Sequence, residues 1–313
     1  MARKNIGAAA TAAEREAEDV LRRVAQWDGR VSGYEPVHGG ISNSNWRVWV
    51  EGEPGSFFVK VPGHGTEMFI DRNAAFAASR RAQDLGIGPT VYDYLADDGV
   101  EITDFIEGRR ACTNSDFLRP DLRRGAVGLY RTFNNSGLLP LTKTVFDMID
   151  EHVAQVRELG GAFPADFAWM DHQYRLARSA LEASGIDLVP CFNDPMPGNF
   201  LVADDASIML IDYEYASNND RCYELAIWCG EMFFPEAVED EVIEEYFGRC
   251  DPQLKARLTV HRALADLKWS TWAMVQNVVS SLDFDFYKYG AWKHMRARSV
   301  MQDTRWPEWL KAV

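Results

Sequence analysis

The sequence has few cysteines for its length. Among 313 residues there are five, and none forms a C-x-x-C pair. An odd number of cysteines in a long chain argues against a disulfide framework. We therefore expect reduced thiols in a cytoplasmic protein. The six histidines show no metal-ligand spacing either.

Long apolar runs and basic runs are also missing. No apolar stretch reaches the length that spans a bilayer, and Arg3 and Lys4 are not followed by the apolar core of a signal peptide. The net charge of −14 argues against non-specific nucleic-acid binding, and no basic run is interleaved with aromatics. We expect no membrane insertion and no nucleic-acid partner; an acidic chain does tolerate a cationic substrate.

The stretch 190–215 carries the most chemistry. Two apolar runs flank a short polar turn, which predicts a strand–turn–strand hairpin. Asp194 and Asn199 lie in the loop before this hairpin, and Asp212 lies at its exit. In a kinase catalytic loop with the same D-x-x-x-x-N spacing, the aspartate takes the proton of the acceptor hydroxyl. The asparagine and a later aspartate after a hydrophobic strand hold magnesium.

A second candidate site lies near the N-terminus. The segment 38–45 has Gly39 and Gly40 followed by small polar residues between two expected strands, which suits a loop whose backbone N–H groups approach phosphates. An ordinary hairpin turn is the alternative, since the G-x-G-x-x-G pattern is absent. Lys60 ends the next apolar strand, where a phosphate-pairing lysine of kinases is found. A strand-end lysine that reaches solvent is the alternative there.

The expected elements predict an α+β fold. A helix over 11–27 precedes strands over 34–37, 45–50 and 57–61, a helix over 70–85, and strands over 90–95 and 100–105. The order β-β-β-α-β-β is the plan of a kinase small lobe, and 107–110 is the expected hinge. Helices then follow at 119–134, 143–159, 167–183, 222–233, 236–248 and 252–280. We predict a bilobal, protein-kinase-like fold: residues 1–107 form a nucleotide-binding lobe of an antiparallel sheet plus a helix, and residues 108–313 form a mostly helical catalytic and substrate-binding lobe.

Aromatic residues gather on the last expected helix. Trp269, Trp272 and Gln276 share one helix face because of their spacing, and Tyr289 and Trp292 follow after a turn. Electron-rich ring faces attract a quaternary ammonium without demanding hydrogen bonds. The alternative is plain core packing, which is the usual role of aromatics at helical spacing.

These features together resemble the choline/ethanolamine kinase family, which is related to aminoglycoside phosphotransferases and more distantly to protein kinases. The resemblance covers roughly residues 34 to 295 and lies in four motifs. These are the loop 39–43, the segments 70–72 and 86–89, the segments 193–199 and 211–216, and the W-x-x-W-x-x-x-Q pattern followed by Tyr289.

The resemblance implies a role for each candidate residue. Asp194 would be the base, and it would also face the substrate hydroxyl. Asn199 and Asp212 would hold Mg²⁺, and Lys60 would contact the phosphates of ATP. The remaining assignments are Gly39, Gly40, Ser42 and Asn43 for the nucleotide, and Trp269, Trp272, Gln276, Tyr289 and Glu214 for the substrate, with Glu214 alternatively supporting the metal.

Three positions depart from the family pattern. Phe192 replaces a histidine that braces the catalytic loop by hydrogen bonds, and packing could brace the loop instead. Ala75 stands where a helix glutamate would pair with Lys60, so Lys60 would lack its usual partner. Glu224 replaces an aspartate after the metal strand.

The resulting hypothesis is a kinase that uses ATP and Mg²⁺ to phosphorylate the hydroxyl of choline or a related amino alcohol. The first alternative is a kinase for an aminoglycoside or another small molecule, although polycationic aminoglycosides prefer a carboxylate-lined site. The second is a pseudokinase that binds a quaternary ammonium ligand or a nucleotide without turnover. The sequence does not decide between choline and ethanolamine, and a homodimer is left open.

Overall fold

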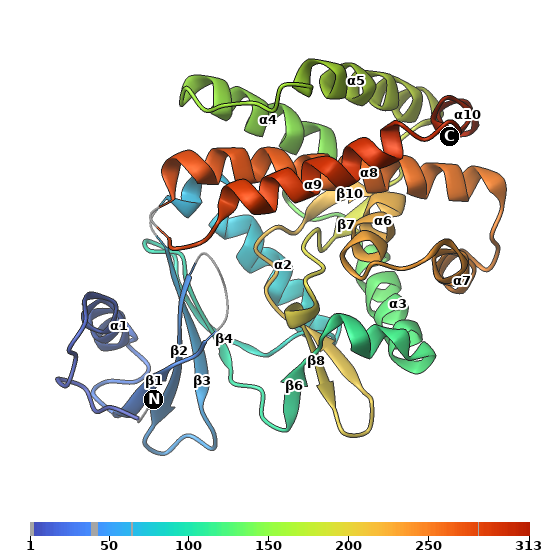
Figure 1. The fold of residues 1–313 in the computed structure, drawn as a ribbon. Coiled ribbons are helices and arrows are strands. Elements are labelled where there is room, and N and C mark those ends of the chain that lie inside the picture. Colours follow the sequence, from blue (N-terminus) through green and yellow to red (C-terminus); the bar gives the residue numbers. More distant parts are fainter. Residues whose placement is uncertain (1–2, 39–42, 64, 281) are drawn as a thin grey trace. The chain divides into compact units, whose positions relative to one another are not determined.

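The structure is a computed structural model that describes residues 3–38, 43–63, 65–280 and 282–313. Its contacts divide the chain into two compact units (Figure 1). The first unit comprises residues 1–109 together with 210–214, and the second comprises 110–209 and 215–313. The predicted roles of the regions 1–107 and 108–313 stay predictions.

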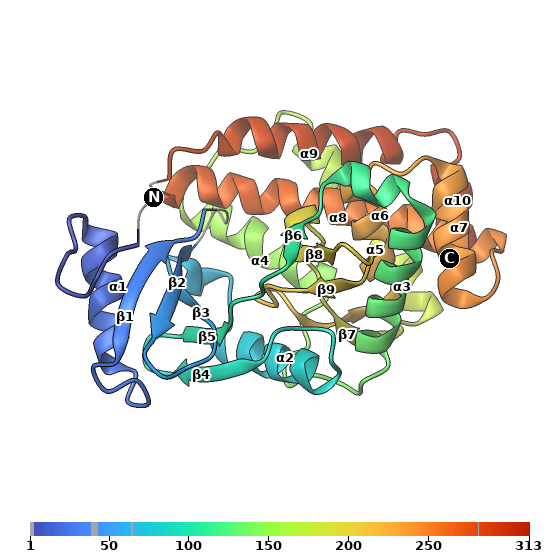
Figure 2. The ribbon, with the colours of Figure 1, turned by 90° about the horizontal axis from the view of Figure 1, so that it is seen from below.

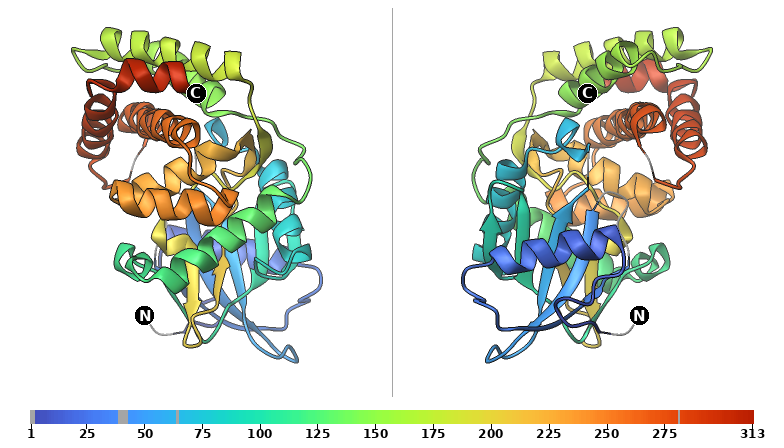
Figure 3. Two further views of the ribbon diagram at one scale, coloured as in Figure 1. Left: turned by 90° about the vertical axis from the view of Figure 1, so that its right-hand side faces the viewer. Right: turned by 90° about the vertical axis from the view of Figure 1, so that its left-hand side faces the viewer.

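The first unit contains, within its described residues, a five-stranded antiparallel sheet of order β1-β2-β3-β5-β4. The strands are β1 (Val31–Pro36), β2 (Asn43–Val50), β3 (Phe57–Pro62), β4 (Val91–Leu95) and β5 (Val100–Asp104), and the helices are α1 (Ala12–Arg23) and α2 (Arg72–Asp84), with the short turn η1 (Thr66–Met68). Helix α1 lies across the sheet (Figure 3, right). The mixed α+β class predicted from the sequence is confirmed.

Alternation along the strands gives the sheet two different faces. Phe57, Val59 and Val61 of β3 belong to the core that also contains the apolar residues of α1. Because successive side chains in a strand point to opposite faces, Lys60 points away from that core. Trp27 also belongs to the core and is fully buried, but α1 ends at Arg23, so the expected helix over 11–27 was too long at its C-terminal end.

The second unit is mostly helical. Its helices are α3 (Pro120–Asn134), α4 (Val145–Glu158), α5 (Phe167–Ser184), α6 (Arg221–Glu231), α7 (Glu236–Phe247), α8 (Pro252–Val279), α9 (Phe286–Met301) and α10 (Trp306–Ala312), and its short turns are η2 (Asn114–Leu118) and η3 (Pro197–Asn199). Helices α8 and α9 run side by side (Figures 1 and 2). Each predicted helix of this region is present with shifts of one or two residues at its ends.

Short strands accompany these helices. Strands β6 (Arg109–Ala111), β8 (Phe200–Ala203) and β9 (Ile208–Leu210) form one sheet, and β7 (Leu188–Cys191) pairs with β10 (Ser217–Asp220). The hairpin predicted within 190–215 is therefore present as β8 and β9. The sequence did not predict the pair of β7 and β10, although this pair frames the loop that carries Asp194.

Candidate functional site

In the first unit, Lys60 on β3 meets two carboxylates. Its Nζ lies 2.5 Å from Oδ1 of Asp212 and 3.5 Å from Oε1 of Glu214. Glu214 is buried, and its Oε1 also lies 2.5 Å from Nη1 of Arg72. Asn43 donates from Nδ2 to both oxygens of Glu214, at 3.0 and 3.1 Å. The structure thus brings four sequence candidates together: Asn43, Lys60, Asp212 and Glu214.

The charges in this cluster compensate one another. Burial disfavours the charged form of Lys60, but the charges of Asp212, Glu214 and Glu101 outweigh it and raise its pKa. Burial raises the pKa of Asp212, although the positive charge of Lys60 acts in the opposite direction. Burial likewise opposes ionisation of Glu214, but Lys60 and Arg72 hold the pKa of that carboxyl below its usual value. Lys60 is therefore a firmly protonated cation, which suits a group that pairs with phosphates.

Asp212 also has an unusual backbone conformation. Its φ is 70°, in the left-handed region that non-glycine residues seldom adopt. Residues 210–214 are fixed to the first unit by a hydrogen bond from the Leu210 N–H to the Ile87 carbonyl, at 2.9 Å. The side chain of Asp212 is 31% exposed, whereas that of Glu214 is 6% exposed. An accessible carboxylate of this kind fits Mg²⁺, which prefers oxygen ligands and keeps several waters.

Glu101 on β5 is a charged neighbour of Lys60 that the sequence analysis missed. It is paired with Lys60 in the register of the two antiparallel strands, so both side chains point to the same face. Ser79 of α2 donates from Oγ to Oε2 of Glu101 at 3.2 Å. Ala75 lies one turn before Ser79 on the same helix face. Lys60 therefore lacks a helix glutamate, as expected, but it is not without carboxylates.

In the second unit, the loop before Asp194 is held by Asn193. This fully buried residue has φ 64°. Its Nδ2 donates to the Tyr215 carbonyl at 2.9 Å and to Ser217 Oγ at 2.8 Å. Its Oδ1 accepts from Nδ2 of Asn219 at 3.2 Å. A left-handed asparagine costs free energy and persists because these bonds fix it, which is typical of functional loops.

Glu224 on α6 also holds this loop, through the backbone. Its carboxylate accepts the backbone N–H of Phe192 and, at 3.2 Å, that of Asn193. Burial raises the pKa of Glu224 to about 7, although these two hydrogen bonds act in the opposite direction. Phe192 is fully buried. Packing of Phe192 together with the carboxylate of Glu224 therefore braces the loop where the family pattern has a histidine.

Asp194 and Asn199 lie close together in this loop. Asn199 donates from Nδ2 to the carbonyl of Asp194 at 2.9 Å and to its Oδ2 at 3.2 Å. The amide is thereby oriented, and its Oδ1 is the atom that remains for a cation. Both residues are half-buried. This donor set fits the predicted pair of a base and a magnesium ligand.

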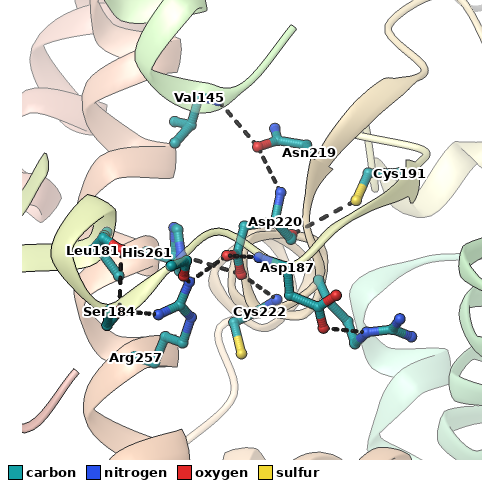
Figure 4. Close-up of polar contacts among 12 residues, drawn as sticks. Val145, Leu181, Ser184, Asp187, Cys191, Asn219, Asp220, Cys222, Arg257 and His261 are labelled. Atoms are coloured by element: carbon teal, nitrogen blue, oxygen red, sulfur yellow. Dashed lines mark hydrogen bonds and ion pairs between the residues drawn. The ribbon is translucent and has the colours of Figure 1, made fainter. Parts of the chain in front are cut away.

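A buried ionic network holds the strand pair β7–β10 next to the loop that carries Asp194 (Figure 4). Asp220 ends β10, accepts the N–H of Cys222 at 2.8 Å, and lies 2.5 Å from Nη2 of Arg257 and 3.3 Å from Nε2 of His261 on α8. Burial opposes the charge of Asp220, but His261 and Arg257 hold its pKa well below the usual range. Since β7 pairs with β10, this network connects the loop that carries Asp194 to α8.

Aromatic rings of the second unit form one continuous cluster. The ring of Tyr215 lies 5.4 Å from that of Trp269, and Trp269 lies 5.4 Å from Trp272, both edge-on. Trp272 lies 6.1 Å from Tyr289 on α9. Gln276 is half-buried on the same helix as the tryptophans. We name the rings of Tyr215, Trp269, Trp272 and Tyr289 the aromatic cluster.

The aromatic cluster lies beside the loop that carries Asp194. Asn193 donates to the carbonyl of Tyr215, and Asp194 is the next residue. Burial raises the pKa of Tyr289, and the negative charges of Glu231 and Asp194 raise it further. The sequence did not single out Tyr215 as a ring of this cluster, although it directly follows Glu214 in the motif 211–216.

Some predicted residues are not brought together here. Gly39, Gly40 and Ser42 lie outside the described residues. Asp212 belongs to the first unit, whereas Asp194 and Asn199 belong to the second, so their convergence on one magnesium stays a prediction. In the described part of the chain no three or more His, Cys, Asp or Glu side chains form a metal-binding group. Over the same residues, no helix is long and apolar enough to cross a bilayer.

The sequence matches the model of a known family. The model described as choline/ethanolamine kinase matches residues 34–247. Among curated proteins, Protein LicA of Haemophilus influenzae is 24% identical over 247 residues, which is 76% of this chain and 72% of that protein.

Solved structures show the same relationship. A choline/ethanolamine kinase family protein from Mesorhizobium loti is similar with a TM-score of 0.82 and 26% identity, over 96% of this chain and 98% of that one. The spectinomycin phosphotransferase APH(9)-Ia is similar with a TM-score of 0.58 and 14% identity, over 92% and 98%. The predicted fold is therefore confirmed, and the spectinomycin phosphotransferase shares it.

Proposed function

Since this chain belongs to the choline/ethanolamine kinase family, we propose that it transfers the γ-phosphoryl group of ATP to the hydroxyl of choline or a related amino alcohol. The family membership makes the chain a phosphotransferase that acts on an alcohol. The choice of acceptor, the use of Mg²⁺ and the residue roles below belong to the proposal.

One observation carries the proposal most directly. In the second unit, Asp194 adjoins an aromatic cluster, and the two are linked by the hydrogen bond from Asn193 to Tyr215. A base next to electron-rich rings is the arrangement that an alcohol with a nearby ammonium group requires, because the rings attract the cation while the base meets the hydroxyl.

Asp194 is proposed to accept the proton of the acceptor hydroxyl and to orient its oxygen toward the γ-phosphate. The donation from Asn199 Nδ2 to Asp194 Oδ2 fixes the carboxylate. Positioning of this kind provides much of the rate in phosphoryl transfer, where the protein supplies little covalent chemistry.

The first unit is proposed to meet the charge of the phosphates. Lys60 would pair with phosphate oxygens, and Asn43 with the loop 39–42 would hold the nucleotide. Asp212 and Asn199 would hold Mg²⁺, which neutralises phosphate charge when it is bound with ATP. Glu214 is saturated by Lys60, Arg72 and Asn43, so we assign it to holding these cations rather than to the substrate.

The aminoglycoside alternative is weaker. Such polycations need several carboxylates near the base, whereas the described surroundings of Asp194 contain the aromatic cluster. The pseudokinase alternative drew support from Phe192 and Ala75. At Phe192, burial of the ring and the hydrogen bond from the backbone N–H to Glu224 brace the loop in place of the histidine. At Ala75, the missing carboxylate is replaced by Glu101, which lies opposite Lys60.

An ADP-release assay with choline, ethanolamine and an aminoglycoside tests the proposal. We expect magnesium-dependent ADP formation with an amino alcohol and none with the aminoglycoside. Calorimetry that detects ligand binding without any ADP formation would favour the pseudokinase instead.

A further inference from the structure

Lys268 on α8 is a buried amine in the middle of the aromatic cluster. It is 1% exposed, and its Nζ lies 3.0 Å from the ring centroid of Trp269 and 4.7 Å from that of Tyr215. Among the described residues, this Nζ has no hydrogen-bond partner. A buried amine left without a partner costs free energy, so its presence calls for a physical reason.

Lys293 on α9 is a buried lysine whose charge is paired, and it serves as a comparison. It is fully buried and also lies near rings, 5.5 Å from the centroid of Tyr289 and 4.9 Å from that of Trp292. Its Nζ forms an ion pair with Glu231 and lies 3.6 Å from Asp266. Among the residues that the structure describes, Lys268 forms no ion pair of this kind, so packing alone does not account for it.

The surroundings of Lys268 disfavour a positive charge on its own amine. Burial holds its pKa well below the ordinary lysine value, and Lys143 and Lys293 act in the same direction. Asp194 opposes them, which also shows that the amine lies within electrostatic reach of the proposed base. An amine buried without a carboxylate partner favours its neutral form, because burial penalises the charged form. A neutral amine has a lone pair, so it can accept a hydrogen bond as well as donate one.

This amine changes what the ring faces can bind. The three methyl groups of a trimethylated ammonium have no N–H to offer, and they would leave the lone pair of Lys268 buried and unpaired. An ammonium that keeps an N–H can donate it to Lys268 while the rings of Tyr215 and Trp269 still stabilise its charge.

Building on the proposed function, we propose that the acceptor is an amino alcohol that keeps at least one N–H, and that Lys268 selects it over choline. Selection by a buried polar group is sharp, because the wrong ligand leaves that group unpaired.

The test is a series of acceptors that differ by single methyl groups: ethanolamine, N-methylethanolamine, N,N-dimethylethanolamine and choline. The expected result is a step of roughly tenfold or more in kcat/KM between the dimethyl and trimethyl compounds, the factor that one lost hydrogen bond gives. A smooth trend with size, or a preference for choline, overturns the inference and leaves the proposed kinase activity standing. Absence of ADP formation with every acceptor overturns both.

Lys268→Met keeps an unbranched side chain that is one atom shorter, and it removes the amine. We expect the preference to shift toward choline by about tenfold, through the acceptor KM, with the KM for ATP unchanged. Lys288→Met, on the exposed part of α9, is the matched control and should leave the preference unchanged. An equal loss with all four acceptors contradicts the assigned role.

Calorimetry on the wild-type protein gives a second readout that needs neither turnover nor a stable variant. Without nucleotide, N,N-dimethylethanolamine should bind about tenfold more tightly than choline. Equal or weaker binding contradicts the inference.

Discussion

The lysines of the two candidate sites, Lys60 and Lys268, have opposite surroundings. In the first unit, Lys60 and Arg72 are paired with the carboxylates of Asp212 and Glu214. In the second unit, Lys268 is surrounded by rings and has no hydrogen-bond partner among the described residues. Paired charges suit a region that receives a polyanion with its metal, because the charges are already positioned. An unpaired amine among rings suits a region that recognises one small polar ligand.

The catalytic loop provides the largest expected effect. Asp194→Asn keeps the shape of the side chain but removes the base, so turnover should fall by about 10²- to 10⁴-fold. Nucleotide binding should remain nearly intact, because the proposed nucleotide residues lie in the first unit. Steady-state kinetics and calorimetry with ADP measure the two effects. Full retained activity would reject the assigned base.

Substitution of Lys60 is the next test, since it removes the cation that pairs with the carboxylates of the first unit. Lys60→Met removes the proposed phosphate contact, and we expect kcat/KM for ATP to fall by about 10²-fold while the acceptor preference stays the same. Lys311→Met, an exposed lysine of α10, serves as the control and should match the wild type. A change in acceptor preference without loss of ATP use would contradict the division of roles between the units.

Glu101 should have a smaller effect. Glu101→Gln removes the negative charge opposite Lys60 on the neighbouring strand, so the KM for ATP should rise roughly fivefold, equivalent to about 1 kcal/mol. Placing a carboxylate on the helix instead, by Ala75→Glu in a Glu101→Ala background, should restore part of the loss. No rescue, together with an unchanged melting temperature, would show that Lys60 does not depend on a neighbouring carboxylate.

The last prediction concerns the pH dependence of stability and not activity. The pKa of Glu224 rises from 4.5 to about 7 on folding, so the folded state holds a proton that the unfolded state releases. Its contribution to stability is present below pH 4.5 and is lost as pH rises to about 7, by about 3 kcal/mol at most. Glu224→Gln should flatten that part of the profile. Chemical denaturation at pH 5 and pH 8 measures it, and an equal slope in both proteins would place the cause elsewhere.

The sequence predicted those parts of the molecule that local patterns determine. The alanine-rich α2, the strand that carries Lys60 and the hairpin after Asn199 follow from spacing and turn residues. The strand β10, with the sequence Ser-Asn-Asn-Asp, was missed because it is polar yet buried. Its side chains bond to distant segments, as when Asn218 donates to the Leu139 carbonyl at 2.8 Å.

The candidate site also shows that local patterns predict only some of its residues. The motif residues Asp194, Asn199 and Asp212 could be named from spacing alone. Glu101 could not, because its position opposite Lys60 depends on the strand order β3-β5, which no local pattern encodes. The position of Lys268 over two rings depends on side-chain directions. A lysine that directly precedes the first tryptophan of the W-x-x-W motif was the available signal.

The central claim is that this chain phosphorylates an amino alcohol, and product analysis tests it most directly. Incubation with γ-labelled ATP, Mg²⁺ and N,N-dimethylethanolamine should transfer the label to the alcohol, and omission of either Mg²⁺ or the acceptor should abolish the transfer. Label that appears only as inorganic phosphate, with no phosphorylated alcohol from any member of the methylation series, would contradict the account.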